Sequence, residues 1–195
     1  VRSRRQRQMC IRDSNSSAGG VNALALGSNA QVTAGNALAV GANSKGLAGY
    51  ATAIGQSAAA SGADSFAAGR GATAAAQGAI AIRGTTTTSA VNSVSIGVSA
   101  SAQGTRAIAI GYSAITGTRV NSIAIGTSSR APEYQSVALG SAAEARHSQA
   151  VALGAGSQSS RDDQIAVAAL TGDHTSLAPP IRVRRSQPRR PPGRG

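Results

Sequence analysis

The large and small apolar residues of this chain alternate in short blocks that recur at a constant interval. A five-residue core of the form small–aliphatic–small–aliphatic–Gly repeats through the central sequence, as in residues 107–111 (AIAIG) and 136–140 (SVALG). Alternation with period two indicates a β-strand, with the aliphatic pair on one face and the small pair on the other. Ten such cores hold their spacing, and residues 164–168 form a degenerate eleventh. This regularity predicts a repeat protein rather than a disordered Ala/Gly/Ser-rich segment.

The glycine that closes each core sets the length of the repeat. Successive glycines recur at a 14-residue interval, apart from one 15-residue step between Gly111 and Gly126. Glycine adopts positive φ without steric strain, so these positions predict chain reversals. Arg83 occupies one glycine slot, and Gly84 is expected to take over the turn there. A second alternation of small residues follows each core, as in residues 58–60, so each repeat is expected to contribute two short strands.

One repeat is too small to fold by itself, because the burial of two aliphatic side chains does not offset the backbone entropy of the whole repeat. Stacking of the repeats into a solenoid supplies the missing hydrogen bonds and burial. We expect the aliphatic side chains, Ile110 among them, to face the interior of the coil. Small residues on both strand faces also predict that sister chains pack closely on this one.

The net charge of +12 at first favours a nucleic-acid ligand. Eleven of the nineteen basic residues, however, lie in residues 1–14 and 182–195, and the body between them is close to neutral. The chain has no Trp and only one Phe and three Tyr, so it lacks the aromatic residues that stack on bases. We therefore expect no specific nucleic-acid partner.

No group of residues predicts catalysis or metal binding. The two histidines, His147 and His174, lack a nucleophile elbow, and the adjacent Asp162 and Asp163 point to opposite faces if they lie on a strand. No Cys/His spacing typical of a metal site occurs, and Cys10 is the single cysteine. We expect neither an enzyme nor a bound cofactor or metal.

Two segments carry a recognisable motif. Residues 92–99 (NSVSIGVS) and 121–128 (NSIAIGTS) each match Asn-Ser-Val-Ala-Ile-Gly-x-Ser with one substitution. With the other cores, they make the chain similar to the head domain of the YadA-like trimeric autotransporter adhesins. The resemblance implies an all-β fold, a left-handed parallel β-roll or solenoid of 14-residue coils assembled as a homotrimer. It also implies a location on the surface of a Gram-negative bacterium, at the outer membrane.

The resemblance further implies a function and a set of contact residues. Such heads bind extracellular matrix proteins such as collagen or the host-cell surface, and they promote self-association. The residues that match the motif are the candidate ligand-binding residues. They are Asn92, Ser93, Val94, Ile96, Gly97, Ser99, Asn121, Ser122, Ile123, Ile125, Gly126 and Ser128.

The repeats divide the chain into four parts. Residues 15–160 are the head repeats, and residues 161–180 are a degenerate last repeat or the approach to a neck. The basic segment 1–14 and the Arg/Pro-rich segment 181–195 lack the repeat; the first is expected to be foreign or disordered, and the second disordered or frame-shifted. Neither a stalk nor a membrane anchor is recognisable, so contact with a membrane is expected only through an anchor outside this chain.

Other functions remain to be compared with adhesion. A structural spacer or a phage-type trimeric fibre segment without a ligand would have the same repeat. An ice-binding solenoid would need a Thr-rich ladder, and only residues 85–88 are dense in Thr. An acyltransferase built on a left-handed β-helix would show a six-residue period and coils of about eighteen residues, which the 14-residue interval disfavours.

Overall fold

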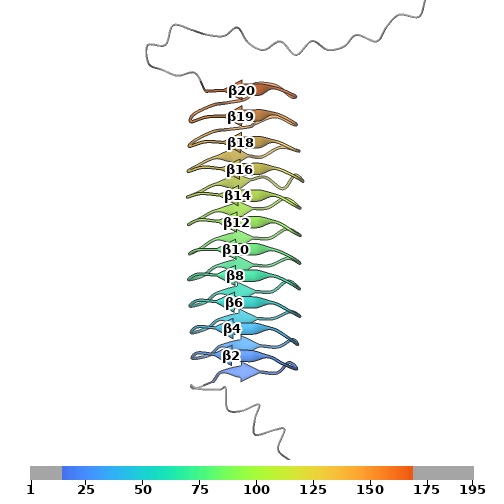
Figure 1. The fold of residues 1–195 in the computed structure, drawn as a ribbon, viewed down its shortest axis with the longest axis vertical. Coiled ribbons are helices and arrows are strands. Elements are labelled where there is room, and N and C mark those ends of the chain that lie inside the picture. The colour runs from blue at the N-terminus through green and yellow to red at the C-terminus, as the bar shows by residue number, and fades with distance from the viewer. Residues whose placement is uncertain (1–14, 169–195) are drawn as a thin grey trace, which may run out of the picture.

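A computed structural model describes residues 15–168 of the chain, and these residues form one parallel β-solenoid (Figure 1). The solenoid has two sheets. The eleven-stranded sheet, called sheet B, contains β2 (Leu24–Leu26), β4 (Leu38–Val40), β6 (Thr52–Ile54), β8 (Phe66–Ala68), β10 (Ile80–Ile82), β12 (Val94–Ile96), β14 (Ile108–Ile110), β16 (Ile123–Ile125), β18 (Val137–Leu139), β19 (Val151–Leu153) and β20 (Ile165–Val167). The nine-stranded sheet, called sheet A, contains β1 (Ser17–Ala18), β3 (Gln31–Val32), β5 (Lys45–Gly46), β7 (Ala59–Ala60), β9 (Thr73–Ala74), β11 (Thr87–Thr88), β13 (Ser101–Ala102), β15 (Ile115–Thr116) and β17 (Arg130–Ala131).

Each strand pairs in parallel with the equivalent strand of the next coil. In sheet B, Ile80 pairs with Val94 and Val94 pairs with Ile108, so equivalent residues of successive repeats lie side by side. We number the coils by their sheet B strands, from rung 1 at β2 to rung 11 at β20. These observations confirm the predicted all-β solenoid and its 14-residue coils.

The single 15-residue step is absorbed by a turn. Ile108 pairs with Ile123 in sheet B, whereas the preceding sheet A pair, Ser101 and Ile115, keeps the ordinary 14-residue spacing. The additional residue therefore lies in the turn after Thr116, and the aliphatic positions of sheet B stay aligned. A turn can take up a residue in this way because its side chains do not pack in the interior.

Two kinds of turn form the edges of the solenoid. The glycine edge consists of the turns that follow the sheet B strands and begin at the recurring Gly, as at Gly27 and Gly41. The asparagine edge consists of the turns that precede the sheet B strands and end at residues such as Asn22 and Asn36. Their backbones also bond from coil to coil, as between the Asn36 N–H and the Val21 carbonyl (2.8 Å). The hydrogen-bond ladder thus continues around the coil.

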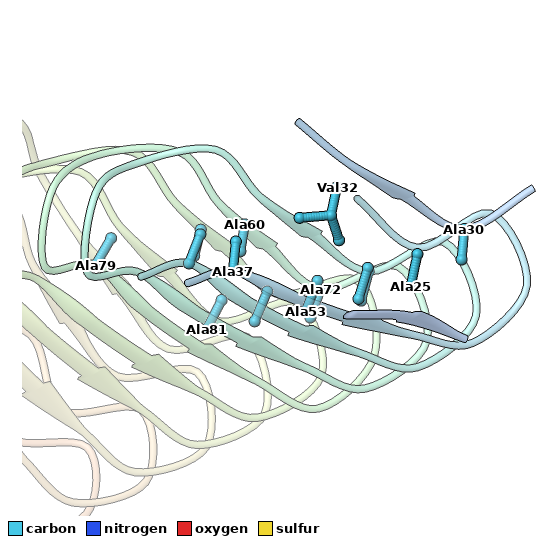
Figure 2. Close-up of a cluster of buried hydrophobic side chains, with 14 residues drawn as sticks. Ala25, Ala30, Val32, Ala37, Ala53, Ala60, Ala72, Ala79 and Ala81 are labelled. Carbon is cyan, nitrogen blue, oxygen red and sulfur yellow. The ribbon is translucent and has the colours of Figure 1, made fainter. Parts of the chain in front are cut away.

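The interior between the two sheets is filled by very small side chains. Ala53, Ala81 and Ala109, each in the middle of a sheet B strand, are fully buried, and Figure 2 shows the alanines of the first rungs pointing between the two layers. Val32 is the largest fully buried side chain, and it lies beside Gly46 of the neighbouring strand, which leaves room for it. The interior is therefore filled mostly by Ala and Ser, and its largest buried side chains are Val32 and three Thr residues, Thr86, Thr88 and Thr116.

The expectation that the aliphatic pair faces inward is wrong. In β14 the burial order is half-buried, buried, half-buried, so Ile108 and Ile110 lie outside and Ala109 lies inside. The segregation of large and small residues onto opposite strand faces is confirmed, but the assignment of the faces is reversed. The reason is the short coil, whose two strands lie too close together to admit Leu or Ile side chains between them in every rung.

Buried hydroxyl groups in the interior are satisfied by backbone carbonyls. The Ser65 hydroxyl donates to the Gly62 carbonyl (2.6 Å), and the Ser129 hydroxyl donates to the Gly126 carbonyl (2.9 Å). A buried hydroxyl without a partner would destabilise the coil, so this local bond explains why Ser can replace Ala at these positions.

The glycine column is a site of close backbone approach. Gly111 has a φ of 131°, and a Cβ atom added there would lie 2.5 Å from the Gly126 carbonyl oxygen. The expectation that Gly84 relieves Arg83 is wrong, because Arg83 itself takes a φ of 81° in the glycine slot. The ladder continues through this position, since the Arg83 N–H donates to the Ala68 carbonyl (2.6 Å).

The last described coil extends beyond the predicted head repeats. β20 pairs in register with β19, so residues 161–168 form an eleventh rung. Residues 1–14 and 169–195 lie outside the described part. The predicted basic segment, the remainder of a neck approach, the Arg/Pro-rich segment and His174 therefore stay predictions.

Candidate functional site

The outer face of sheet B is a continuous apolar ridge. Two side chains per rung point outward, and each is stacked in register on the corresponding side chain of the next rung. Leu26, Ile54 and Leu153 are 44%, 41% and 44% exposed in the single chain. Eleven rungs at a strand spacing of ~4.8 Å give the ridge a length of about 50 Å. An apolar surface of this extent is typical of a protein interface.

The outer face of sheet A is different, because most of its outward side chains are small or polar. Ala59, Thr73, Thr87 and Ser101 form consecutive positions of one column at the centre of this face. Charged side chains interrupt the column towards the two ends, for example at Lys45. The centre of sheet A is therefore a flat surface without large side chains.

The candidate ligand-binding residues from the sequence do not form one cluster. Asn92 lies on the asparagine edge and Ser99 on the glycine edge, and both have positive φ (54° and 59°). Asn121 and Ser128 occupy the equivalent positions of rung 8. These four side chains lie on the two edges of the solenoid, outside its interior.

The other members of the motif occupy the ridge, the backbone turns and the interior. Val94, Ile96, Ile123 and Ile125 belong to the ridge, with Ile125 38% exposed. Gly97 and Gly126 belong to the glycine column, with φ values of 129° and 134°.

Two candidate residues must be corrected. Ser93 and Ser122 are fully buried inside the coil, so their hydroxyls cannot contact a ligand. The Ser93 hydroxyl instead donates to the Ala90 carbonyl. The sequence could not separate these serines from exposed ones, because Ser occurs at both kinds of position in the repeat. The ligand-binding role of the remaining ten residues stays a prediction.

Side-chain amides form hydrogen bonds along the asparagine edge. The Asn22 amide nitrogen donates to the Asn36 amide oxygen (3.1 Å), one coil apart. The Arg106 Nε donates to the Asn121 amide oxygen (3.0 Å) in the same way. The edge is therefore a column of residues in the left-handed conformation, which Asn tolerates better than most residues. The repeat pattern alone predicts positive φ at the Gly positions and does not indicate it at the Asn positions.

The described titratable residues form an ion pair and hydrogen bonds but no metal-binding group. Within residues 15–168 no three His, Cys, Asp or Glu side chains lie close enough to hold a metal ion. Glu144 forms an ion pair with Arg146, and one Asp162 carboxylate oxygen accepts a hydrogen bond from the Ser148 N–H (3.0 Å). His147 Nδ1 lies 3.3 Å from the Ser159 hydroxyl. Within the same residues no helical segment has the length and hydropathy of a membrane span.

Comparison with a solved structure shows the same fold. The crystal structure of the collagen-binding domain of the Yersinia adhesin YadA superposes with a TM-score of 0.60 at 21% sequence identity, over 81% of this chain and 87% of that chain. No curated protein matches the chain.

A family comparison covers most of the described solenoid. The sequence model of the YadA head domain repeat, which spans two copies, matches residues 18–44, 48–72, 60–82, 89–114, 120–143 and 131–157. Together these matches span more than half of the 195 residues. The chain belongs to the YadA head domain family.

Proposed function

We propose that this chain is an adhesive head of a bacterial surface fibre, which binds extracellular matrix proteins or the host-cell surface and promotes self-association. The observation that carries the proposal is the pair of outer faces: an apolar ridge suited to sister chains and a flat face of small side chains on the opposite side. The YadA head repeats and the similarity to a collagen-binding domain support it. The proposed mode of action is binding, without catalysis or a cofactor.

The assembly that we propose is a homotrimer in which the ridges of three chains face a common axis. A single chain leaves Leu26 and Leu153 each 44% exposed, and their burial between chains would contribute the free energy that one thin coil lacks. Repetition of the same contact over eleven rungs gives such an interface a large area. The trimer of the family and the ridge therefore support the same arrangement.

This arrangement leaves the outer face of sheet A for the ligand. The small side chains Thr73, Thr87 and Ser101 allow an extended, rod-like partner to approach the backbone over several rungs. Asn92 and Asn121 lie on the asparagine edge, at the border between that face and the neighbouring chain, and supply amide donors and acceptors there. Collagen, which is a rod with exposed backbone carbonyls, is a ligand of this shape.

The location that we propose is the outer surface of a Gram-negative bacterium, with the head exposed to the medium. The proposal rests on the family, since stalk and anchor segments are not recognisable in this sequence.

A binding assay tests this function. The full chain is applied in solution to immobilised collagen, fibronectin and laminin, with albumin as the control surface, while sedimentation records its oligomeric state. We expect saturable binding to at least one matrix protein. An intact trimer that binds none of them and does not adhere to host cells would favour the alternative function, a structural spacer or a phage-type fibre segment.

A further inference from the structure

Rung 4 differs from the other described rungs in the residues that it presents. Its strand β8 places Phe66 and Ala68 at the two ridge positions, which in most rungs carry two aliphatic residues. Asp64 lies on the asparagine edge before this strand, and Arg70 lies on the glycine edge after it. Among the eleven described rungs, this is the only one with an aromatic ridge residue and the only one with opposite charges on its two edges.

The two charges of rung 4 have no ionic partner within the described chain. Both side chains are exposed, and the ion pair found among residues 15–168 joins Arg146 to Glu144. Asp64 and Arg70 lie in the turns at opposite ends of β8, on different edges of the solenoid, and the strand between them separates their Cα atoms by at most about 20 Å. They cannot reach each other within one chain.

A cyclic assembly brings these residues together between chains. If the ridges of identical chains face an axis parallel to the solenoid, the glycine edge of each chain lies beside the asparagine edge of the next, at the same height. Ala68 and Arg70 of one chain then meet Phe66 and Asp64 of its neighbour. In this arrangement the Phe66 ring lies over the Ala68 methyl group of the next chain. The Arg70 guanidinium lies beside the Asp64 carboxylate.

The repetitive ridge makes the axial alignment of the chains a physical problem. A shift by one rung exchanges one aliphatic residue for another along most of the ridge, and therefore changes the packing energy little. At rung 4 the same shift would place Phe66 against Ile54 or Ile82 instead of Ala68. A shift towards rung 3 would also place Asp64 beside Gln56 of the neighbour instead of Arg70, whereas a shift towards rung 5 would bring it near Arg83.

We propose that rung 4 is the register key of the assembly: the interchain contacts of Phe66 with Ala68, and of Asp64 with Arg70, fix three sister chains at the same height. The proposal rests on the homotrimer of the proposed function and names the residues that align it. Overpacking at Phe66 disfavours a shift in either direction, and loss of the charge pair adds to this for a shift towards rung 3, so the key acts mainly by excluding shifted alignments.

The size contact is tested with a variant pair on the full chain. Ala68→Phe places two rings against each other at every interface, and we expect it to lower the melting temperature of the assembly by roughly 5–10 °C. The double variant Phe66→Ala/Ala68→Phe exchanges the partners and restores the complementarity, so it is expected to melt within about 2 °C of the unmodified protein. Ala59→Phe, on the outer face of sheet A, is the matched control and leaves the assembly unchanged.

The charge contact is tested in the same way at exposed turn positions, where folding of the single coil is not at risk. Asp64→Arg is compatible with the backbone, because Arg106 occupies the equivalent position with a φ of 58°, against 57° for Asp64. It places two guanidinium groups together and is expected to lower the assembled fraction in sedimentation equilibrium. Asp64→Arg/Arg70→Asp restores the pair, and this rescue must be intermolecular because the two sites are far apart in one chain.

The outcomes separate this inference from the function on which it rests. Rescue by both double variants supports the register key. A trimeric unmodified chain whose double variants are as unstable as the sum of their single variants overturns the key and leaves the homotrimer standing. A monomeric unmodified chain overturns both. Circular dichroism of each variant establishes that the coil itself is folded.

Discussion

Ala109 and Ile110 are neighbours in β14, yet the methyl group of Ala109 is fully buried between the sheets and the side chain of Ile110 lies half-buried on the outer ridge. In most folds the larger apolar residue of such a pair would be the core residue. Here the core of the single chain consists mainly of Ala methyl groups. The aliphatic side chains point outward, where another chain can pack against them. Substitutions on the two faces of one strand should therefore affect different levels of the structure.

Enlarging an interior alanine should destabilise the coil itself. Ala109→Leu adds a branched side chain where two sheets are already in contact, so we expect a loss of about 1–3 kcal/mol or more in the free energy of unfolding. Ile110→Leu, one residue away on the ridge, is the matched control and should change stability by less than about 1.5 kcal/mol. Denaturant unfolding of both variants measures the difference. Equal effects of the two substitutions would contradict the reversed assignment of the strand faces.

The glycine column should tolerate no side chain. In Gly111→Ala the new Cβ would lie 2.5 Å from the Gly126 carbonyl oxygen at a φ of 131°, so we expect destabilisation of about 1–3 kcal/mol. Gly35→Ala is the control, because its Cβ would meet its nearest neighbour at 3.5 Å and its φ is not left-handed. Thermal unfolding should separate the two variants clearly; a tolerated Gly111→Ala would mean that the close approach is not needed.

Arg83 is the exception in the glycine column, and its replacement is expected to stabilise the chain. Arg83 holds a φ of 81°, which is unfavourable for a residue with a Cβ atom. Arg83→Gly relieves this strain and should raise the melting temperature of the chain by a few degrees. Arg83→Gln, which removes the same charge but keeps the Cβ atom, controls for electrostatics. If both variants shift the melting temperature alike, the strain at Arg83 is negligible.

A charge on the ridge should dissociate the chains without unfolding the coil. Ile110→Asp places a carboxylate on the face that we assign to sister chains, where burial of an unpaired charge is unfavourable. The matched control is Ile115→Asp, in the same coil but on the outer face of sheet A. We expect sedimentation to show loss of the trimer for the first variant and its retention for the second, with unchanged β-sheet circular dichroism for both. Retention of the trimer by both would remove the ridge from the interface.

Side chains that rise above the sheet A face should weaken ligand binding. Thr73→Lys/Ser101→Lys introduces two long side chains two rungs apart, and Lys45 shows that the column accepts Lys. We expect the affinity for the bound matrix protein to fall on the order of tenfold. Ser17→Lys/Gln31→Lys, which adds the same charge at the N-terminal end of the sheet A column, is the control. An assay in which only the control pair weakens binding would transfer the ligand site to that end of the sheet.

Much of the fold was predictable because the repeat is encoded locally. The constant 14-residue interval between glycines, and the alternation in segments such as 58–60, predicted two parallel ladders of short strands. The motif in residues 92–99 and 121–128 predicted the family. The degenerate core at 164–168 contributes the eleventh rung. The period, the strands and their pairing depend only on residues close in sequence or on the equivalent residues of the next coil. A repeating sequence pattern specifies both sets of residues.

The candidate site was less predictable, because one motif is distributed over surfaces with different environments. Asn92 and Ser99 lie on opposite edges of the coil, whereas Ser93 between them is buried. No property of the Ser residues themselves separates these positions. Their roles depend on the direction in which each Cβ leaves the coil.

The sequence by itself determined the period, the strand segments and their alignment, because backbone pairing between identical coils follows from the spacing of Gly and of the aliphatic pairs. Only the tertiary structure decided which face of each strand is the core. Period-two alternation is symmetric between the two faces, and the choice depends on the distance between the sheets that a 14-residue coil can enclose. That distance admits the methyl group of Ala109 and leaves Ile110 outside, where it can contact another chain.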